Sequence, residues 1–188
     1  MIWRMLYFSD LQQLSVHEQM LVFAGAYLDS AEVLCNNLYS DKERANYAHG
    51  AVVMSLAFHS LELFFKGCIL RSFPAEQFNG KAGHDLDALS KRFFRLYPKK
   101  EFQFEVPFRY ETSGIIEKMA PTNELAELLA YIEEHRRKAP EDKRHRYPIS
   151  GNGKAWEGAF GFEPNSFLVT LRELQQVYAC IRSLLYEG

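Results

Sequence analysis

The segment from Ala51 to Leu70 is apolar on almost every side. Its strongly polar residues are His59, Glu62 and Lys66. A helix that is hydrophobic all round lies at the centre of a protein or spans a membrane. Each charge would cost about 2.5 to 3.5 kcal/mol at a bilayer centre, whereas Glu62 and Lys66, at i,i+4 spacing, can pair on a soluble helix. The sequence therefore predicts a central helix from about residue 44 to 73, ended by Pro74.

A second long helix is predicted before it, over residues 11–39. Apolar residues recur there every seven positions, with small or apolar residues offset by three, the spacing of a helix packed lengthwise on another. This seam comprises Leu14, Leu21, Leu28 and Cys35, with Ala24, Ala31 and Leu38. A wider second stripe suits either a subunit interface or a three-sided bundle core; it comprises Met20, Phe23, Tyr27 and Leu34.

The composition limits the fold and the chemistry. With 188 residues, 47% of them hydrophobic, the chain can bury one core, and we expect a single domain over 1–188. The net charge of −2 gives no global sign of a nucleic-acid or membrane protein. Cys35, Cys68 and Cys180 lie in apolar patterns without Cys-x-x-Cys spacing, so we expect reduced core residues, no metal and no cofactor. The first ten residues lack the pattern of a signal peptide, and we expect a cytoplasmic protein.

The pattern changes after Pro98, within a predicted insertion at about 98–122. Apolar and polar residues alternate from Phe102 to Tyr110, which predicts a strand limited to a sheet edge by Pro107. Residues 159–162 are its possible partner in a small β-hairpin. A closing amphipathic helix follows Pro164, with Asn165 or Ser166 as its cap. The predicted fold is mainly α: an up-and-down bundle of four to five helices with a small β-hairpin insertion.

Three sequence segments together resemble the HEPN superfamily. They are His59–Leu70, which carries Glu62 and Lys66; Gly83–Leu89, which begins Gly83, His84, Asp85; and Arg146–Pro148 before the last helix. The matches and the helices between them cover about two thirds of the chain. The resemblance implies a helical bundle, usually dimeric, in a superfamily of RNA-cleaving toxins, phage-defence proteins and non-catalytic members that bind nucleotides or nucleic acid.

In active members, an Arg and a later His are separated by four to six residues, and the two carry out metal-independent RNA cleavage. Arg44 and His49 match this spacing. In such a pair the His transfers a proton to or from the reacting oxygens, and the Arg stabilises the charge that develops on the phosphate. About one such match is expected by chance in this composition. The pair also precedes the Glu62–Lys66 segment, whereas active members carry theirs on a later helix, and Ala45 stands where a polar residue commonly follows the Arg. A solvated Arg and a helix-side His are the simpler interpretation.

The remaining histidines suggest structural roles. His59 and Glu62 could form half of a metal site, but no second ligand pair has suitable spacing, so we expect a polar cluster with Lys66. We expect Gly83 or His84 to cap the helix that follows it. His17 lies on the seam of the first helix and is expected to be partly buried.

A basic segment follows a short predicted helix capped by Thr122 or Asn123. Residues 136–146 carry a net charge of +4, within a loop of about 136–163. Arginine side chains can form paired hydrogen bonds to phosphates, and aromatic rings can stack on bases. A solvated loop explains the same pattern equally well. The candidate nucleic-acid-binding residues are Arg136, Arg137, Lys138, Lys143, Arg144, Arg146 and Tyr147.

Three hypotheses follow. The first is a non-catalytic HEPN-type protein that binds RNA or nucleotide, in a toxin-antitoxin or phage-defence setting, with a second copy or an antitoxin as protein partner. The second is a metal-independent ribonuclease toxin that uses Arg44 and His49. The third is a module that binds only protein, through the aromatic segment at 102–110.

Overall fold

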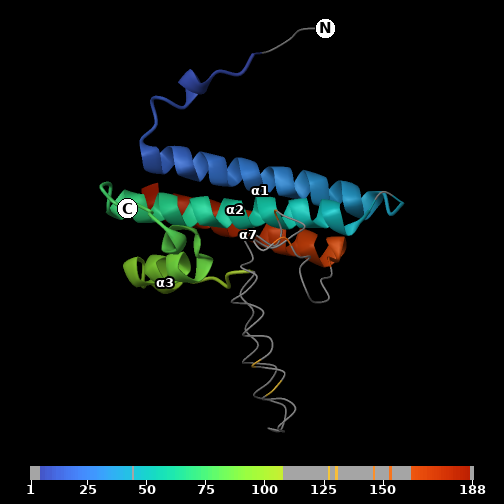
Figure 1. The fold of residues 1–188 in the computed structure, drawn as a ribbon. Coiled ribbons are helices and arrows are strands. Elements are labelled where there is room, and N and C mark those ends of the chain that lie inside the picture. Colours follow the sequence, from blue (N-terminus) through green and yellow to red (C-terminus); the bar gives the residue numbers. More distant parts are fainter. Residues whose placement is uncertain are drawn as a thin grey trace.

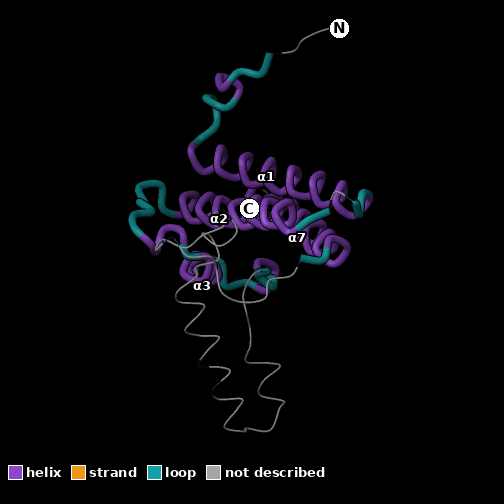
Figure 2. Tube along the Cα trace, turned by 45° about the vertical axis from the view of Figure 1, so that its right-hand side comes forward, coloured by secondary structure: helices purple, strands orange, loops and turns teal. Residues whose placement is uncertain are grey.

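A computed structural model describes residues 5–43, 45–107 and 162–186, and the single residues Glu127, Ala130, Arg146 and Gly153. The described part is helical: α1 (Val16–Ser40), α2 (Tyr47–Ser72), α3 (Leu86–Leu96) and α7 (Pro164–Tyr186), with short 3-10 turns η1 (Phe8–Asp10), η2 (Lys81–His84) and η3 (Lys100–Phe102). In both views α1 runs along one side of α2, and α3 lies on the opposite side (Figures 1 and 2). The mainly helical bundle predicted from the sequence is confirmed.

The helices α1 and α2 form an antiparallel hairpin. Leu21 lies against Gly67, and the Ser60 hydroxyl donates to the carbonyl of Ala24 at 2.7 Å. Residue numbers therefore increase along α1 in the direction in which they decrease along α2. Six residues of the predicted seam are buried: Leu21, Ala24, Leu28, Ala31, Cys35 and Leu38. Leu14 and His17, nearer the start of the seam, are half-buried. Because α2 also contacts α3 and α7, it is buried on several sides, as its all-round apolar sequence predicts.

Local sequence signals set the helix ends. Ser15 and Glu18 form a capping box at the start of α1, and the Asn46 side chain accepts from the backbone of His49 at the start of α2. These two ends differ from the predicted starts at 11 and 44 because the cap residues follow those positions. The amino end of α7 is capped by Glu163, whose carboxylate accepts from the backbone of Asn165 and Ser166 at 3.0 and 2.6 Å. The prediction that Asn165 or Ser166 would cap this helix is therefore wrong.

Aromatic rings fill the space between α2 and its neighbours. Phe64 stacks on Tyr178 of α7 at 3.9 Å between ring centroids, and Phe65 packs on Phe93 of α3 at 5.3 Å. Tyr178 places its hydroxyl 3.1 Å from that of Ser60, so one buried hydroxyl pair links α1, α2 and α7. Large rings in close contact hold the bundle through apolar burial and ring geometry.

The predicted β-hairpin insertion is not found among the described residues. After η3, residues 103–106 belong to neither a helix nor a strand and Pro107 lies in a turn, and 108–110 and 159–161 lie outside the described residues. The alternation has a different cause: Phe104 packs beside Phe65 and Val106 is buried, whereas Gln103 and Glu105 are exposed. An extended chain buries every second side chain whether its neighbour is a strand or, as here, a helical bundle.

Candidate functional site

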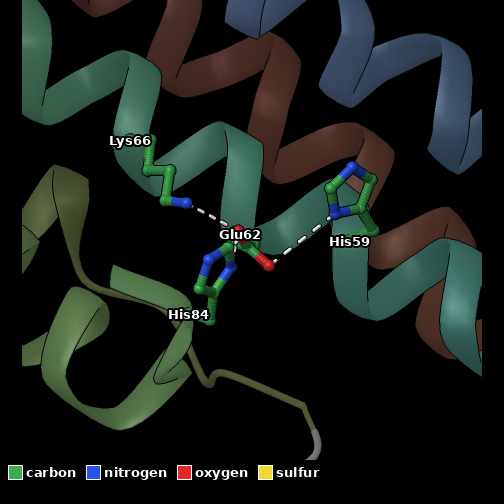
Figure 3. A network of polar contacts seen from close by, with 4 residues as sticks. All are labelled: His59, Glu62, Lys66 and His84. Atoms are coloured by element: carbon green, nitrogen blue, oxygen red, sulfur yellow. Dashed lines mark hydrogen bonds and ion pairs between the residues drawn. The ribbon is translucent and has the colours of Figure 1, made fainter. Parts of the chain in front are cut away.

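Two segments of the predicted family motif meet at one buried carboxylate. Glu62 of α2 is 1% exposed, and its Oε1 accepts from Lys66 Nζ at 2.6 Å and from His84 Nδ1 at 2.9 Å. Figure 3 shows Lys66 and His84 reaching the carboxylate from different directions, with His84 coming from η2. The i,i+4 pair predicted from the sequence is confirmed, and its contact with His84, 22 positions away, is a result of the fold.

Lys66 is also held in place by an aromatic ring. Its ammonium lies 5.3 Å from the ring centroid of Phe78, in the loop that leads to η2, and the residue is buried. A buried lysine is stable when a carboxylate neutralises it and a ring face covers it. The Glu62–Lys66 pair is therefore neutral overall and lies inside the protein.

The charge of Glu62 is set by opposing effects. Burial raises the pKa of the Glu62 carboxyl, but the interactions with His59 and Lys66 and the nearby charges of Lys66 and His84 outweigh burial and lower it to about 2. The carboxylate is thus ionised over the whole physiological pH range. Together with the bond to Nδ1 of His84, this fixes a proton on that nitrogen, because a carboxylate only accepts.

The other carboxylate oxygen faces His59. Nδ1 of His59 lies 3.7 Å from Oε2 of Glu62, too long for a hydrogen bond, and both atoms are buried without a hydrogen-bond partner. The ring of His59 meets Tyr27 of α1 edge to face, with 4.6 Å between centroids. The predicted polar cluster of His59, Glu62 and Lys66 is present, with His59 as its loosest member.

His84 does not cap α3, contrary to the sequence-based prediction. Asp85 has that role, because its Oδ1 accepts from the backbone of Asp87 at 2.9 Å and of Ala88 at 3.2 Å. Gly83 is needed for a different reason: a Cβ there would lie 2.7 Å from the carbonyl oxygen of Phe78. Gly83 lets the turn close, Asp85 starts the helix, and His84 between them is free to reach Glu62.

Two rings of this cluster remain accessible at its surface. The side chains of His59 and His84 are 30% and 57% exposed, respectively. Since Nδ1 of His84 is bound to Glu62, its Nε2 edge is the one available to a ligand. In the neutral ring this Nε2 accepts a hydrogen bond, whereas in the imidazolium it donates one, so that the ring can then bind an anion.

Other predicted site residues lie apart from this cluster or outside the described residues. His49 is exposed in the first turn of α2, and 13 residues of helix separate it from Glu62, about 20 Å. Arg44 lies outside the described residues, so the predicted Arg44–His49 pair has no observed geometry. Of the basic segment, Arg146 is described and is exposed in a turn; Arg136, Arg137, Lys138, Lys143, Arg144 and Tyr147 are outside the described residues.

The described part of the chain holds no group of three or more His, Cys, Asp or Glu residues arranged to bind a metal ion. A separate shallow hollow of about 250 Å³ lies between the 104–107 segment and α7. Its lining combines apolar residues with Glu105 and Glu173.

Comparison with known proteins was made for the whole chain. No protein-family model, curated protein or solved structure matches it. Among the described helices, α2 is the one with the length and hydropathy to cross a membrane, and 72% of its apolar window is buried within the bundle. A core helix has the same property.

Proposed function

We propose that this chain is a non-catalytic HEPN-type protein that binds RNA or a nucleotide. The observation that carries the proposal is the 2.9 Å contact between His84 and Glu62. It joins two of the three sequence segments on which the resemblance depends, and it does so inside a helical bundle. Residues that are only coincidentally similar to a motif have no reason to converge on one buried ion pair.

The ligand class follows from the resemblance and from charge. The segment 136–146 has a net charge of +4 in a chain whose total is −2. Lysine and arginine contacts to phosphate supply most of the affinity of proteins for nucleic acid without sequence preference. We assign ligand contact to this segment, Arg136, Arg137 and Arg144 above all, and the role of Glu62 and Lys66 to holding the bundle.

Binding without cleavage is favoured over the ribonuclease hypothesis by the position of His49. Its ring has no hydrogen-bond partner among the described residues that would orient it, and it lies far from the polar cluster around Glu62. A catalytic base needs a defined tautomer and orientation, which usually come from a second polar group. The described surroundings of His49 supply none.

The test is equilibrium binding of a fluorescent single-stranded RNA and of a fluorescent nucleotide, in EDTA, from about 50 to about 200 mM salt. Replacement of Arg136, Arg137 and Arg144 by Glu should abolish a strongly salt-dependent association. The matched control replaces the exposed Lys91, Lys99 and Lys100 by Glu, which changes the net charge equally. Equal loss in both triple variants would show a nonspecific charge effect and remove the segment as the contact surface.

The same RNA samples are then run on a denaturing gel, beside His49→Ala. Intact RNA is the expected result. Fragments with 2′,3′-cyclic phosphate ends that disappear in His49→Ala would instead establish the ribonuclease hypothesis.

A further inference from the structure

The hollow between the 104–107 segment and α7 has a firm apolar floor, and this observation is independent of the proposed function. Four apolar side chains line its volume of about 250 Å³: Phe104, Pro107, Leu174 and Val177. Leu174 is buried, and the ring of Phe104 lies 6.0 Å from that of Phe65 in the core. Because packing in the bundle fixes these side chains, the hollow exists before a ligand arrives and its walls need no ordering.

Two acidic side chains also line the hollow, Glu105 from the segment and Glu173 from α7. Both are exposed, and neither forms an ion pair or a hydrogen bond with another described residue. The residues one helical turn from Glu173 include no basic side chain; they are Val169, Thr170, Gln176 and Val177. Arg172, the next residue along the chain, donates to Glu32 of α1 at 3.0 Å. Among the described residues, the two carboxylates therefore lie beside the apolar floor without a cation to neutralise them.

This combination selects a ligand with a positive charge on an apolar stem. An anion, including the phosphates of a nucleotide or of RNA, would be repelled by both carboxylates. A bare divalent cation fits poorly, because Ca²⁺ and Mg²⁺ take about six or more oxygen ligands, and most of this lining is apolar. An organic cation suits both parts of the site, because its charge neutralises the carboxylates and its stem covers the floor.

A guanidinium matches the two carboxylates better than an ammonium does. It carries several N–H donors in one plane, so it can bond to carboxylates from two different elements, and it is less strongly hydrated. The hollow is also smaller than the pockets of roughly 300 to 1,000 Å³ that hold drug-sized ligands, which suits a group the size of an arginine side chain. We infer that the hollow binds an alkylguanidinium, whose stem lies on the apolar floor and whose N–H groups donate to Glu105 and Glu173. A free small molecule and an arginine side chain of another protein present the same group.

The first measurement is a titration of the full isotope-labelled chain with propylguanidine, followed by two-dimensional NMR. We expect saturable shifts of the amide signals of residues 104–106 and 170–177. Propylurea has the same shape without the charge, and we expect it to bind about tenfold more weakly because it forms neither ion pair. Equal binding of the two compounds, or the absence of saturable shifts at the hollow, overturns the inference.

The two carboxylates are then removed in turn. Glu105→Gln and Glu173→Gln should each raise the dissociation constant for propylguanidine about threefold, and the double variant about tenfold, as expected for exposed ion pairs. The matched control is Glu101→Gln, which makes the same change in net charge at an exposed position outside the hollow and should leave the constant within about 1.5-fold. Equal weakening by Glu101→Gln would show a general charge effect and would overturn the inference.

A blocked peptide, acetyl-alanyl-arginyl-alanine amide, identifies the source of the group. Tighter binding of this peptide than of propylguanidine supports an arginine side chain of a protein as the natural ligand, because the peptide backbone then adds contacts. Equal or weaker binding of the peptide supports a free alkylguanidinium.

Discussion

Nδ1 of His84 donates to Oε1 of Glu62 across 2.9 Å, and Lys66 donates to the same oxygen at 2.6 Å. One carboxylate oxygen thus ties the turn before α3 to the central helix. Lys66 lies on α2 itself, whereas His84 arrives through the 73–85 connection. The stability of the bundle and the position of His84 at its surface therefore depend on the same side chain.

Removal of the Glu62 charge should destabilise the protein strongly. Glu62→Gln leaves Lys66 buried without its counter-ion, which typically costs about 3 to 5 kcal/mol. Urea unfolding followed by circular dichroism measures the free energy. The control is Glu76→Gln, which removes a partly exposed ion pair with Arg92 and should cost no more than about 1 kcal/mol. Equal losses for the two variants would contradict the assignment of a buried pair.

Acid should reveal the lowered pKa of Glu62. Its carboxyl has a pKa of about 2 when folded, against an ordinary value of 4.5, because interactions with His59 and Lys66 outweigh the opposing effect of burial. A lowered carboxyl pKa stabilises the fold fully above about pH 4.5, and that contribution is lost as the pH falls toward 2. The difference corresponds to roughly 3 kcal/mol.

Thermal unfolding measured across this pH range, for the wild type and Glu62→Gln, checks the prediction. The advantage of the wild type should shrink from pH 5 toward pH 2, a window set by the two pKa values. A constant difference between the two proteins would show that Glu62 does not titrate with a lowered pKa.

Loss of the His84 side chain should loosen the η2 turn while leaving the bundle folded. His84→Ala removes one hydrogen bond to a charged group, worth about 1.5 to 3 kcal/mol, but leaves the Glu62–Lys66 pair intact. Hydrogen exchange should become faster in residues 78–86 and stay unchanged at the centre of α1. His17→Ala, at a half-buried position of α1 away from Glu62, is the control. Unchanged exchange around η2 would mean that the bond to Glu62 does not hold the turn.

A methyl group at Gly50 should disturb the junction between α2 and the start of α7. A Cβ there would lie 2.6 Å from two ring atoms of Phe162, which itself packs on Phe167. We expect Gly50→Ala to cost about 1 to 3 kcal/mol. Gly25→Ala in α1, where no atom lies within 4 Å of the added methyl, should instead stabilise by up to about 1 kcal/mol. Thermal unfolding of the two variants should therefore shift in opposite directions.

The aromatic alternation at 102–110 shows where sequence reasoning reached its limit. The alternation was read correctly, and Val106 is indeed buried while Glu105 is exposed. The inferred strand was wrong for the described residues. An alternation of apolar and polar side chains indicates only that a chain segment places one side against an apolar surface. It does not say whether hydrogen bonds to a neighbouring strand are made.

The sequence by itself determined the helices and their buried sides. Local patterns in the sequence predicted which sides of three helices are buried: one seam of α1, most of α2 and one stripe of α7. The i,i+4 spacing of Glu62 and Lys66 likewise predicted their ion pair. Such features depend on neighbours within a few turns of one helix.

Tertiary structure alone decided the long-range contacts. Only the fold brings His84 to Glu62 rather than to the cap of α3, and only the packing of α7 on α1 brings Arg172 to Glu32 and Gln175 to Asp29. The physical reason is that hydrogen bonds and ion pairs between distant segments depend on how the helices pack, and no local pattern in the sequence records that packing.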